Sequence, residues 1–333
     1  MHASGLEFGV LLHTRHLIRE EGATDFSPLW EDARFADQIG FDHLWLGDSV
    51  TILEKARGDC LTTMAALAVV TEKIRLATAP FLAALRNPVT LAHALATLDV
   101  ISRGRMIIGA SVGSVKQDMN DQFDACGIPH DEKAGRLNEC LELLRRLWTE
   151  KSVTFEGRYY QLKDVGILPR PVQKPTIPLW ITTGKNDRAL RRAARFGDGW
   201  ITNASTLEDF ARYRQTLDLY AREYGRERQI GSMALDASFH LDADGDRARA
   251  RGWAWTEDFF RQPKAKLSQH AAIFGSPDEC AAMLRGYMDA GLTAIIARFA
   301  SDDQKAQMQL AMDELKPRLA AKVENRRNGE SAL

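Results

Sequence analysis

Apolar and polar positions alternate along the chain in a repeating order of short strand-like runs and longer helix-like runs. The strand-like runs lie at 6–12, 43–47, 74–80, 105–111, 178–182, 199–202, 233–241 and 292–299. The helix-like runs carry apolar residues every three or four positions and lie at 28–40, 60–71, 88–102, 132–150, 187–197, 207–223, 276–291 and 303–319. The pattern thus predicts eight strands, each followed by a helix.

This alternation favours an α/β fold, a closed (β/α)8 barrel of the TIM type, although an open doubly wound sheet also fits it. Two insertions interrupt the order. After the fourth helix, residues 153–178 predict a short hairpin and a proline-rich connector. Before the seventh helix lies a polar stretch with Trp253 and Trp255. We expect a single barrel domain over 1–323 and a flexible tail at 324–333.

Composition limits the partners and the compartment. The 333 residues are 45% hydrophobic, which suffices for a large core, and the net charge of −1 without a basic block makes nucleic acid an unexpected partner. The N-terminus lacks the basic-then-apolar order of a signal peptide, and no apolar run reaches the length of about 18 residues that a membrane helix needs. The four cysteines are scattered, so we expect reduced thiols, a cytoplasmic location and no membrane contact.

In such a barrel, ligands bind at the loops that follow the strands. The turn after the fifth strand contains Gly184, Lys185 and Asn186 immediately before a helix. A helix N-terminus attracts anions, and glycine allows a ligand to approach the backbone. The alternative is an ordinary turn in which Asn186 or Asp187 caps the helix. Asp187 would repel an anion if it pointed inward.

The segment 109–113 matches G-x-S-x-G, in which Ser111 would be a hydrolase nucleophile. That interpretation needs a helix directly afterwards, whereas a polar, poorly periodic segment follows, and His240 or His270 has no clear partner carboxylate for a triad. We prefer the interpretation that the glycines let the backbone approach a flat ligand.

Three further polar residues follow predicted strands. His13 and His16 have a spacing that could suggest a metal, but no third ligand is near them in the sequence, so no metal site is predicted. Arg86 either faces a substrate or pairs with a carboxylate.

Several segments together resemble the bacterial luciferase-like family of flavin- or deazaflavin-dependent oxidoreductases and monooxygenases. The resemblance covers about residues 6–320, and it is most specific in RNPVTLAHALATLDVISRGR and RRAARFGDGW. Membership implies a TIM-type barrel with an insertion. It also implies that the flat ring of FMN, or of the deazaflavin coenzyme F-420, lies at the mouth formed by the C-terminal ends of the strands.

The resemblance also assigns cofactor-binding residues. The phosphate turn of the family falls on Thr183, Gly184, Lys185 and Asn186, and the turn beside the ring falls on 110–113, which includes Ser111. The bulge that supports the ring falls on Ala79 and Pro80. Family members often have a cis peptide bond there, and a cis bond costs less before proline, so we expect a cis bond between Ala79 and Pro80.

The chain departs from the family at two places. Many members have an acid–histidine pair after the second strand, where this chain has Asp48 and Ser49, so the predicted catalytic residues are Asp48, Ser49 and His13. The predicted substrate-binding residues are His16 and Arg86. Luciferase-type proteins carry a phosphate-binding arginine after the fourth strand, where this chain has Val112; Lys185 could supply that charge instead.

These features predict an oxidoreductase that acts on a small organic molecule, with FMN as the predicted cofactor and the deazaflavin coenzyme F-420 as the alternative. With FMN, reduced flavin from a separate reductase would react with oxygen and oxidise the substrate as a monooxygenase does. With the deazaflavin, a hydride would move directly to or from the substrate. A non-catalytic flavin-binding protein is the alternative from another class. The absence of a Rossmann-type G-x-G-x-x-G argues against tight binding of NAD(P)H, and the family resemblance implies a homodimer.

Overall fold

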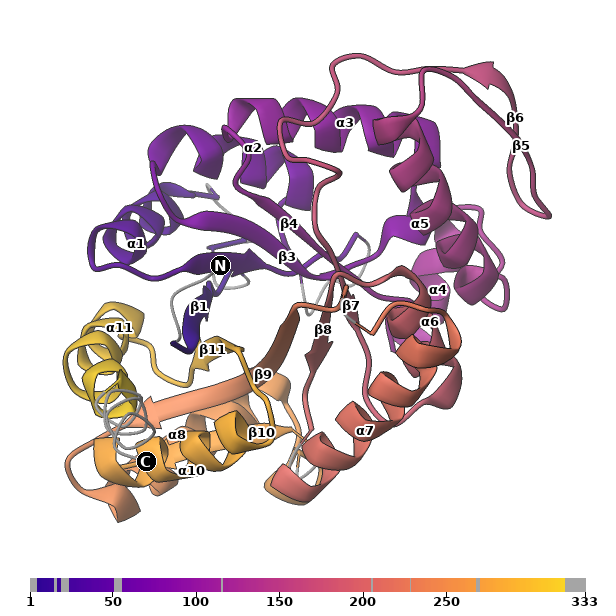
Figure 1. Cartoon of the computed structure of the whole chain (residues 1–333). Helices are drawn as coiled ribbons and strands as arrows, with labels where there is room; N and C mark the ends of the chain where they lie inside the picture. Colours follow the sequence, from indigo (N-terminus) through magenta and orange to yellow (C-terminus); the bar gives the residue numbers. More distant parts are fainter. Residues whose placement is uncertain are drawn as a thin grey trace, which may run out of the picture.

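The computed structural model describes residues 5–14, 17–18, 24–50, 56–114, 116–204, 206–227, 229–267 and 270–320. Figure 1 shows the strands at the centre of the molecule and the helices around them. In the described part, no helix combines the length and the apolar content that crossing a membrane requires. The predicted flexible tail at 324–333 lies outside the described residues.

Eight parallel strands close into a barrel. Their order around the ring is β1 (Glu7–Leu11), β2 (His43–Leu46), β3 (Arg75–Phe81), β4 (Met106–Ala110), β7 (Leu179–Thr182), β8 (Gly199–Thr202), β9 (Ser232–Leu241) and β11 (Ala294–Phe299). Strand β8 pairs with β9, and β11 pairs with β1, so the sheet has no open edge along this ring. These are the eight strands expected from the sequence, and the closed barrel is confirmed over the open sheet.

The helices cover the outer face of the barrel. They are α1 (Ser27–Gln38), α2 (Cys60–Val70), α3 (Pro88–Ile101), α4 (Gln117–Ala125), α5 (Lys133–Thr149), α6 (Asp187–Phe196), α7 (Leu207–Glu223), α8 (Gly245–Phe260), α9 (Lys264–Leu267), α10 (Pro277–Asp289) and α11 (Gln304–Leu310), with short turns η3 (Ala83–Leu85) and η4 (Ala311–Leu315). Polar side chains cap several of them. At α10, for example, Ser276 and Glu279 form a capping box, each bonding the other's backbone N–H.

The strands are apolar on both faces because one face meets the helices and the other fills the barrel. The interior cluster consists of Leu11, Trp45, Ala77, Ala79, Ile107, Trp180, Ile201, Ala234, Ala294 and Ile296. The indoles of Trp45 and Trp180 are the largest side chains of this cluster, and their ring centroids lie 5.4 Å apart. A Cβ on Gly199 would come within 2.7 Å of Trp180, so glycine makes room for the large side chain.

The two interruptions of the alternation fold differently. The predicted hairpin is confirmed as β5 (Val153–Glu156) and β6 (Gln161–Val165), which project away from the barrel in Figure 1. The polar stretch with two tryptophans forms helix α8, and a ninth parallel strand, β10 (Ala271–Gly275), then pairs with the C-terminal half of β9. The sequence pattern did not predict β10.

Candidate active site

A layer of polar side chains lies above the apolar filling of the barrel, at the C-terminal ends of the strands. Side chains alternate between the two faces of a strand, so residues two or four positions beyond an interior residue also face inward. The residues on this register within the strands are Thr182, Asp236, Ser238 and Arg298, and those just beyond strand ends are His13, Ser49, Ser111 and Asn203. Three of the predicted site residues, His13, Ser49 and Ser111, are thus brought to one mouth.

The segment Ala79–Pro80 forms the expected irregularity at the end of β3. The peptide bond between these residues is cis, as predicted. The pairing of β3 with β4 shifts register between Thr78 and Phe81, which is a β-bulge. The Pro80 carbonyl accepts a hydrogen bond from the Asp48 backbone N–H at 3.1 Å, so the bulge is joined to the loop after β2. Its role as a support for a cofactor ring stays a prediction.

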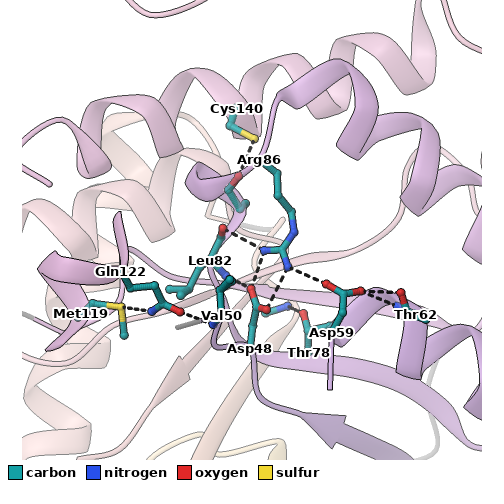
Figure 2. Close-up of polar contacts among 12 residues, drawn as sticks. Asp48, Val50, Asp59, Thr62, Thr78, Leu82, Arg86, Met119, Gln122 and Cys140 are labelled. Atoms are coloured by element: carbon teal, nitrogen blue, oxygen red, sulfur yellow. Dashed lines mark hydrogen bonds and ion pairs between the residues drawn. The ribbon is translucent and has the colours of Figure 1, made fainter. Parts of the chain in front are cut away.

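Asp48 is the centre of a buried ion-pair network (Figure 2). Arg86 donates from Nη1 to Oδ2 at 2.7 Å and from Nη2 to Oδ1 at 3.1 Å, and the Leu82 backbone N–H donates to Oδ2 at 3.1 Å. Of the two alternatives for Arg86, pairing with a carboxylate is the one observed. Burial alone would lower the pKa of Arg86, but the hydrogen bonds and charge of Asp48 raise it.

The network fixes the shape of the mouth between β2 and β3. Arg86 Nη2 also lies 3.5 Å from Asp59 Oδ2, and Asp59 caps α2 by accepting from the Thr62 N–H at 2.8 Å. The Asp48 side chain is only 1% exposed, and its oxygens already accept three hydrogen bonds. This geometry favours a positioning role for Asp48; its role as a proton acceptor stays a prediction.

Two buried hydroxyl groups at the mouth have no hydrogen-bond partner in the described part of the chain. They are Ser49 Oγ, after β2, and Thr182 Oγ1, at the end of β7. Buried polar atoms are almost always hydrogen-bonded in proteins, and an unsatisfied one costs about 1–3 kcal/mol. A bound ligand with polar edges would satisfy both groups.

An aromatic wall, which we define as Trp255, Phe259 and Phe260 at the end of α8, flanks the mouth. The His13 ring stacks on Trp255 with centroids 4.7 Å apart and also contacts Phe259 at 5.2 Å. Phe260 stacks on His270 at 5.4 Å, just before β10. His16, predicted to contact the substrate, lies outside the described residues.

The wall escaped the sequence prediction because α8 was not recognised as a helix. The spacing of Trp255 and Phe259, four residues apart, was the available signal.

His270 and Arg298 add ionisable groups to the mouth. Burial lowers the pKa of His270, and the positive charge of Arg298 lowers it further, which favours the neutral imidazole at pH 7. The Arg298 guanidinium lies over the Phe260 ring at 5.4 Å and 3.6 Å from Asp236 Oδ1. A neutral imidazole has a ring nitrogen free to accept a proton, although the nearby cation weakens it as a base. The sequence prediction had not assigned His270 to an oxidoreductase site.

The turn after β7 has the features of an anion site. Within the described residues, the backbone N–H groups of residues 184–188 have no acceptor, because the first such bond in α6 comes from Ala189 to Asn186, which is the N-cap. A Cβ on Gly184 would meet only Asn203 Oδ1, at 3.7 Å, so the space above this glycine is open. Lys185 is exposed at the same turn.

Asp187 does not oppose an anion there, because its carboxylate turns away. It lies 3.4 Å from Arg191 Nε and accepts a hydrogen bond from Tyr220 Oη. The cap at Asn186 and the free N–H groups of residues 184–188 are present together, so the two alternatives drawn from the sequence do not exclude each other.

Ser111 shows no features of a hydrolase nucleophile. Its Oγ accepts a hydrogen bond from the Gly113 N–H at 3.1 Å, and no described histidine contacts it. Helix α4 begins only at Gln117, not directly after the serine. Gly109 packs so closely on β3 that a Cβ at this position would clash with the Thr78 carbonyl. The close packing of the two strands therefore explains why position 109 is a glycine. Among the described residues, no cluster of side chains could hold a metal ion.

Comparisons with known proteins agree with this geometry. The model of the luciferase-like monooxygenase family matches residues 6–271, so the chain belongs to that family. The F420-dependent glucose-6-phosphate dehydrogenase of Kineococcus radiotolerans is 29% identical over 313 residues, which cover 85% of this chain and 90% of that protein.

Two solved structures extend the comparison. The monooxygenase RslO1 from Streptomyces bottropensis superposes with a TM-score of 0.81 at 26% identity, over 94% of this chain and 99% of that one. The coenzyme F420-dependent tetrahydromethanopterin reductase of Methanopyrus kandleri has a TM-score of 0.76 at 20% identity, over 95% and 100% of the two chains, and so shows the shared fold. The predictions of family, fold and enzymatic nature are confirmed.

Proposed function

We propose that the protein is an oxidoreductase that binds a deazaflavin coenzyme of the F420 type across the mouth of the barrel and catalyses hydride transfer with a small polar substrate. The observation that carries the cofactor site is the turn at 184–188, whose unbonded N–H groups and open glycine suit a phosphate. The choice of deazaflavin rests on the dehydrogenase relative, which matches along 85% of this chain.

The second candidate is FMN with oxygen as co-substrate, which the similarity to the monooxygenase RslO1 favours. When bound, a deazaflavin supplies two-electron hydride chemistry, whereas reduced FMN also reacts with oxygen. The protein contributes orientation and exclusion of water in either case. The homodimer, the separate reductase and the cytoplasmic location stay predictions.

The residues of the mouth have distinct proposed tasks. The aromatic wall and the bulge at Ala79–Pro80 would hold a flat ring between them. Ser49 Oγ would hydrogen-bond the substrate beside the ring, since this hydroxyl is buried and unpartnered among the described residues. His270, which is neutral at pH 7, would accept a proton from the substrate at a ring nitrogen. Asp48 and Arg86 would position the loop that carries Ser49.

Binding of the two cofactors to the purified protein tests this proposal. F420 and FMN are each titrated while cofactor fluorescence is followed, and retention after gel filtration is recorded. Turnover is then followed under nitrogen and under air. Tight F420 binding and turnover that does not need oxygen support the deazaflavin assignment, whereas FMN binding with oxygen consumption assigns the second candidate. Retention of neither cofactor would contradict the proposed function.

The phosphate turn is tested separately with Gly184→Asp, which places a carboxylate where the anion would lie. Loss of one charge-assisted hydrogen bond is worth about 1.5–3 kcal/mol, so affinity for F420, and for FMN where FMN binds, should fall about tenfold or more. Riboflavin, which lacks the phosphate, is the matched ligand control for Lys185→Ala and should bind nearly as well to that variant as to the wild type. Equal losses of affinity for FMN and riboflavin would show that the phosphate does not bind at this turn.

A further inference from the structure

Arg57, in the loop between β2 and α2, extends its guanidinium into the barrel mouth. Trp45 belongs to the interior cluster, so Gly47, two positions later, continues the inward register. A Cβ on Gly47 would lie 2.7 Å from Arg57 Cζ. The guanidinium therefore occupies the interior space that a side chain at position 47 would otherwise fill. This explains why position 47 is a glycine.

The Arg57 guanidinium is a cation without a bonded counter-charge in the described part of the chain. Its Nε is buried and lacks a hydrogen-bond partner, and no hydrogen bond or ion pair among the described residues involves its other nitrogens. Burial lowers the pKa of Arg57, and the charge of Arg298 lowers it further, while Asp48 acts in the opposite direction. Asp48 is not a bonded partner of Arg57, because its oxygens accept from Arg86 and the Leu82 N–H, and no hydrogen bond or ion pair joins it to Arg57 among the described residues.

Arg298 lies on the same wall of the mouth and is only loosely paired. Its Nη2 is 3.6 Å from Asp236 Oδ1, beyond hydrogen-bond distance, and that oxygen has no hydrogen bond within the described residues. Asp48 is bonded to Arg86, which also lies near the half-exposed Asp59, and Asp236 lies near Arg298. Among the described groups of this wall, Arg57 is therefore the guanidinium that has no bonded carboxylate.

This wall lies across the mouth from the turn that we assign to the cofactor phosphate. Around the ring, β1 separates β11, which carries Arg298, from β2, which leads to Arg57. Strand β7, which leads to the turn at 184–188, is three strands away from both β2 and β11. A cofactor that places its phosphate at β7 leaves the donors of Arg57 and Arg298 to a different anion.

We propose that Arg57 and Arg298 form a subsite that binds the anionic group of the substrate, a carboxylate or a phosphate, on the wall formed by β11, β1 and β2. The inference rests on the proposed function, because it assigns the bound anion to the substrate of the proposed oxidoreductase. Guanidinium groups offer planar pairs of N–H donors that match either anion. Bound there, the anion would supply the bonded counter-charge that Arg57 lacks and place the rest of the substrate beside Ser49.

The test uses the cofactor-free protein with inorganic phosphate and, separately, acetate as probes. Binding is measured by calorimetry and by the shift in thermal unfolding, in the wild type, Arg57→Met and Lys185→Ala. We expect Arg57→Met to weaken anion binding at least about tenfold, because charged hydrogen bonds are lost. Lys185→Ala, on the opposite wall, is the matched control and should retain the Arg57-dependent binding.

Stability without any anion provides the second measurement. A partly buried guanidinium whose buried Nε has no partner among the described residues costs free energy, so Arg57→Met should be at least as stable as the wild type in anion-free buffer. Loss of stability in that buffer, equal anion affinity in wild type and Arg57→Met, or absence of anion binding to the wild type would each overturn the subsite.

Titration of the cofactor separates the two sources of anion. Unchanged cofactor affinity in Arg57→Met supports the assignment of the anion to the substrate. A tenfold loss of cofactor affinity would show that Arg57 binds the cofactor instead and would overturn the proposal. Failure of the protein to bind either cofactor would refute the proposed redox function without changing the anion measurements.

Discussion

Removal of the charge of Asp48 tests whether this residue positions the site or takes part in proton transfer. Asp48→Asn keeps the shape of the side chain but removes the buried carboxylate that Arg86 bonds, leaving only the half-exposed Asp59 at 3.5 Å. The pair is well shielded from water, with side-chain exposures of 1% for Asp48 and 19% for Arg86. Breaking such a pair from one side typically costs about 3 kcal/mol or more, because a charge stays in a poorly solvated place.

The corresponding shift in melting temperature follows from the size of the chain. Unfolding entropy is about 2.1 cal/mol/K per residue, which for 333 residues gives about 0.7 kcal/mol/K. A loss of about 3 kcal/mol should therefore lower the melting temperature by about 4 °C. Thermal unfolding followed by circular dichroism measures this shift, and chemical denaturation checks the free energy.

A double-mutant cycle isolates the pair. Arg86→Met removes the cation that Asp48→Asn leaves without its bonded partner. The double variant should therefore lose about 2 kcal/mol less unfolding free energy than the sum of the losses in the two single variants. The matched control is the exposed pair of Arg191 and Glu223, which also lie 2.7 Å apart. Glu223→Gln should cost less than about 1 kcal/mol, because water screens that pair.

Turnover in the same variants distinguishes positioning from chemistry. If Asp48 positions the loop, the double variant should regain part of the turnover that Asp48→Asn loses, with cofactor affinity nearly unchanged throughout. Strictly additive stability losses would refute the ion-pair argument. A double variant that is stable, binds cofactor and has no turnover would instead assign Asp48 to proton transfer.

Two further predictions concern the mouth. Ser49→Ala removes a buried hydroxyl without a partner among the described residues, so the free energy of unfolding should rise by about 1 kcal/mol while substrate binding weakens; a loss of stability in urea unfolding would contradict this. His270 has a lowered pKa in the folded state, so as the pH falls below about 6.5 the unfolded state binds the proton first and stability decreases. His270→Gln should make the free energy of unfolding depend less on pH between about pH 7.5 and about pH 5. An unchanged pH dependence would show that other groups titrate in this range.

The barrel could be predicted from the sequence because its strands are buried on both faces. Such strands are continuous apolar runs, and the helices between them have a different period, so the order of elements can be recognised without any contact information. Strand β10 could not be recognised in this way. It has only five residues, Ala271–Gly275, and its pairing with β9 depends on the tertiary fold.

The candidate site was predictable only where local sequence determines local shape. The turn at Gly184 and the cis bond before Pro80 depend on neighbouring residues, and both features are observed. The pairing of Asp48 with Arg86 joins residues 38 positions apart, and the sequence left it as one of two alternatives.

Arg57 illustrates why the remaining part of the site was out of reach. It lies in no strand and in no recognisable motif, and its importance comes from the missing side chain of Gly47, ten residues earlier. From the sequence alone, Arg57 is an arginine in a loop, and such a residue is most often exposed to solvent. Only the folded structure shows that its guanidinium lies beside Gly47.

The charged residues inside the strands are different. Asp236 and Arg298 interrupt buried apolar runs, and a charge is rarely placed there without a partner or a ligand. An inward register counted from Ala234 in β9 and from Ala294 and Ile296 in β11 brings both side chains to the mouth. The strand pattern itself therefore contained the signal for Arg298, whereas the signal for Arg57 arises only from the way in which the folded loop fills the space beside Gly47.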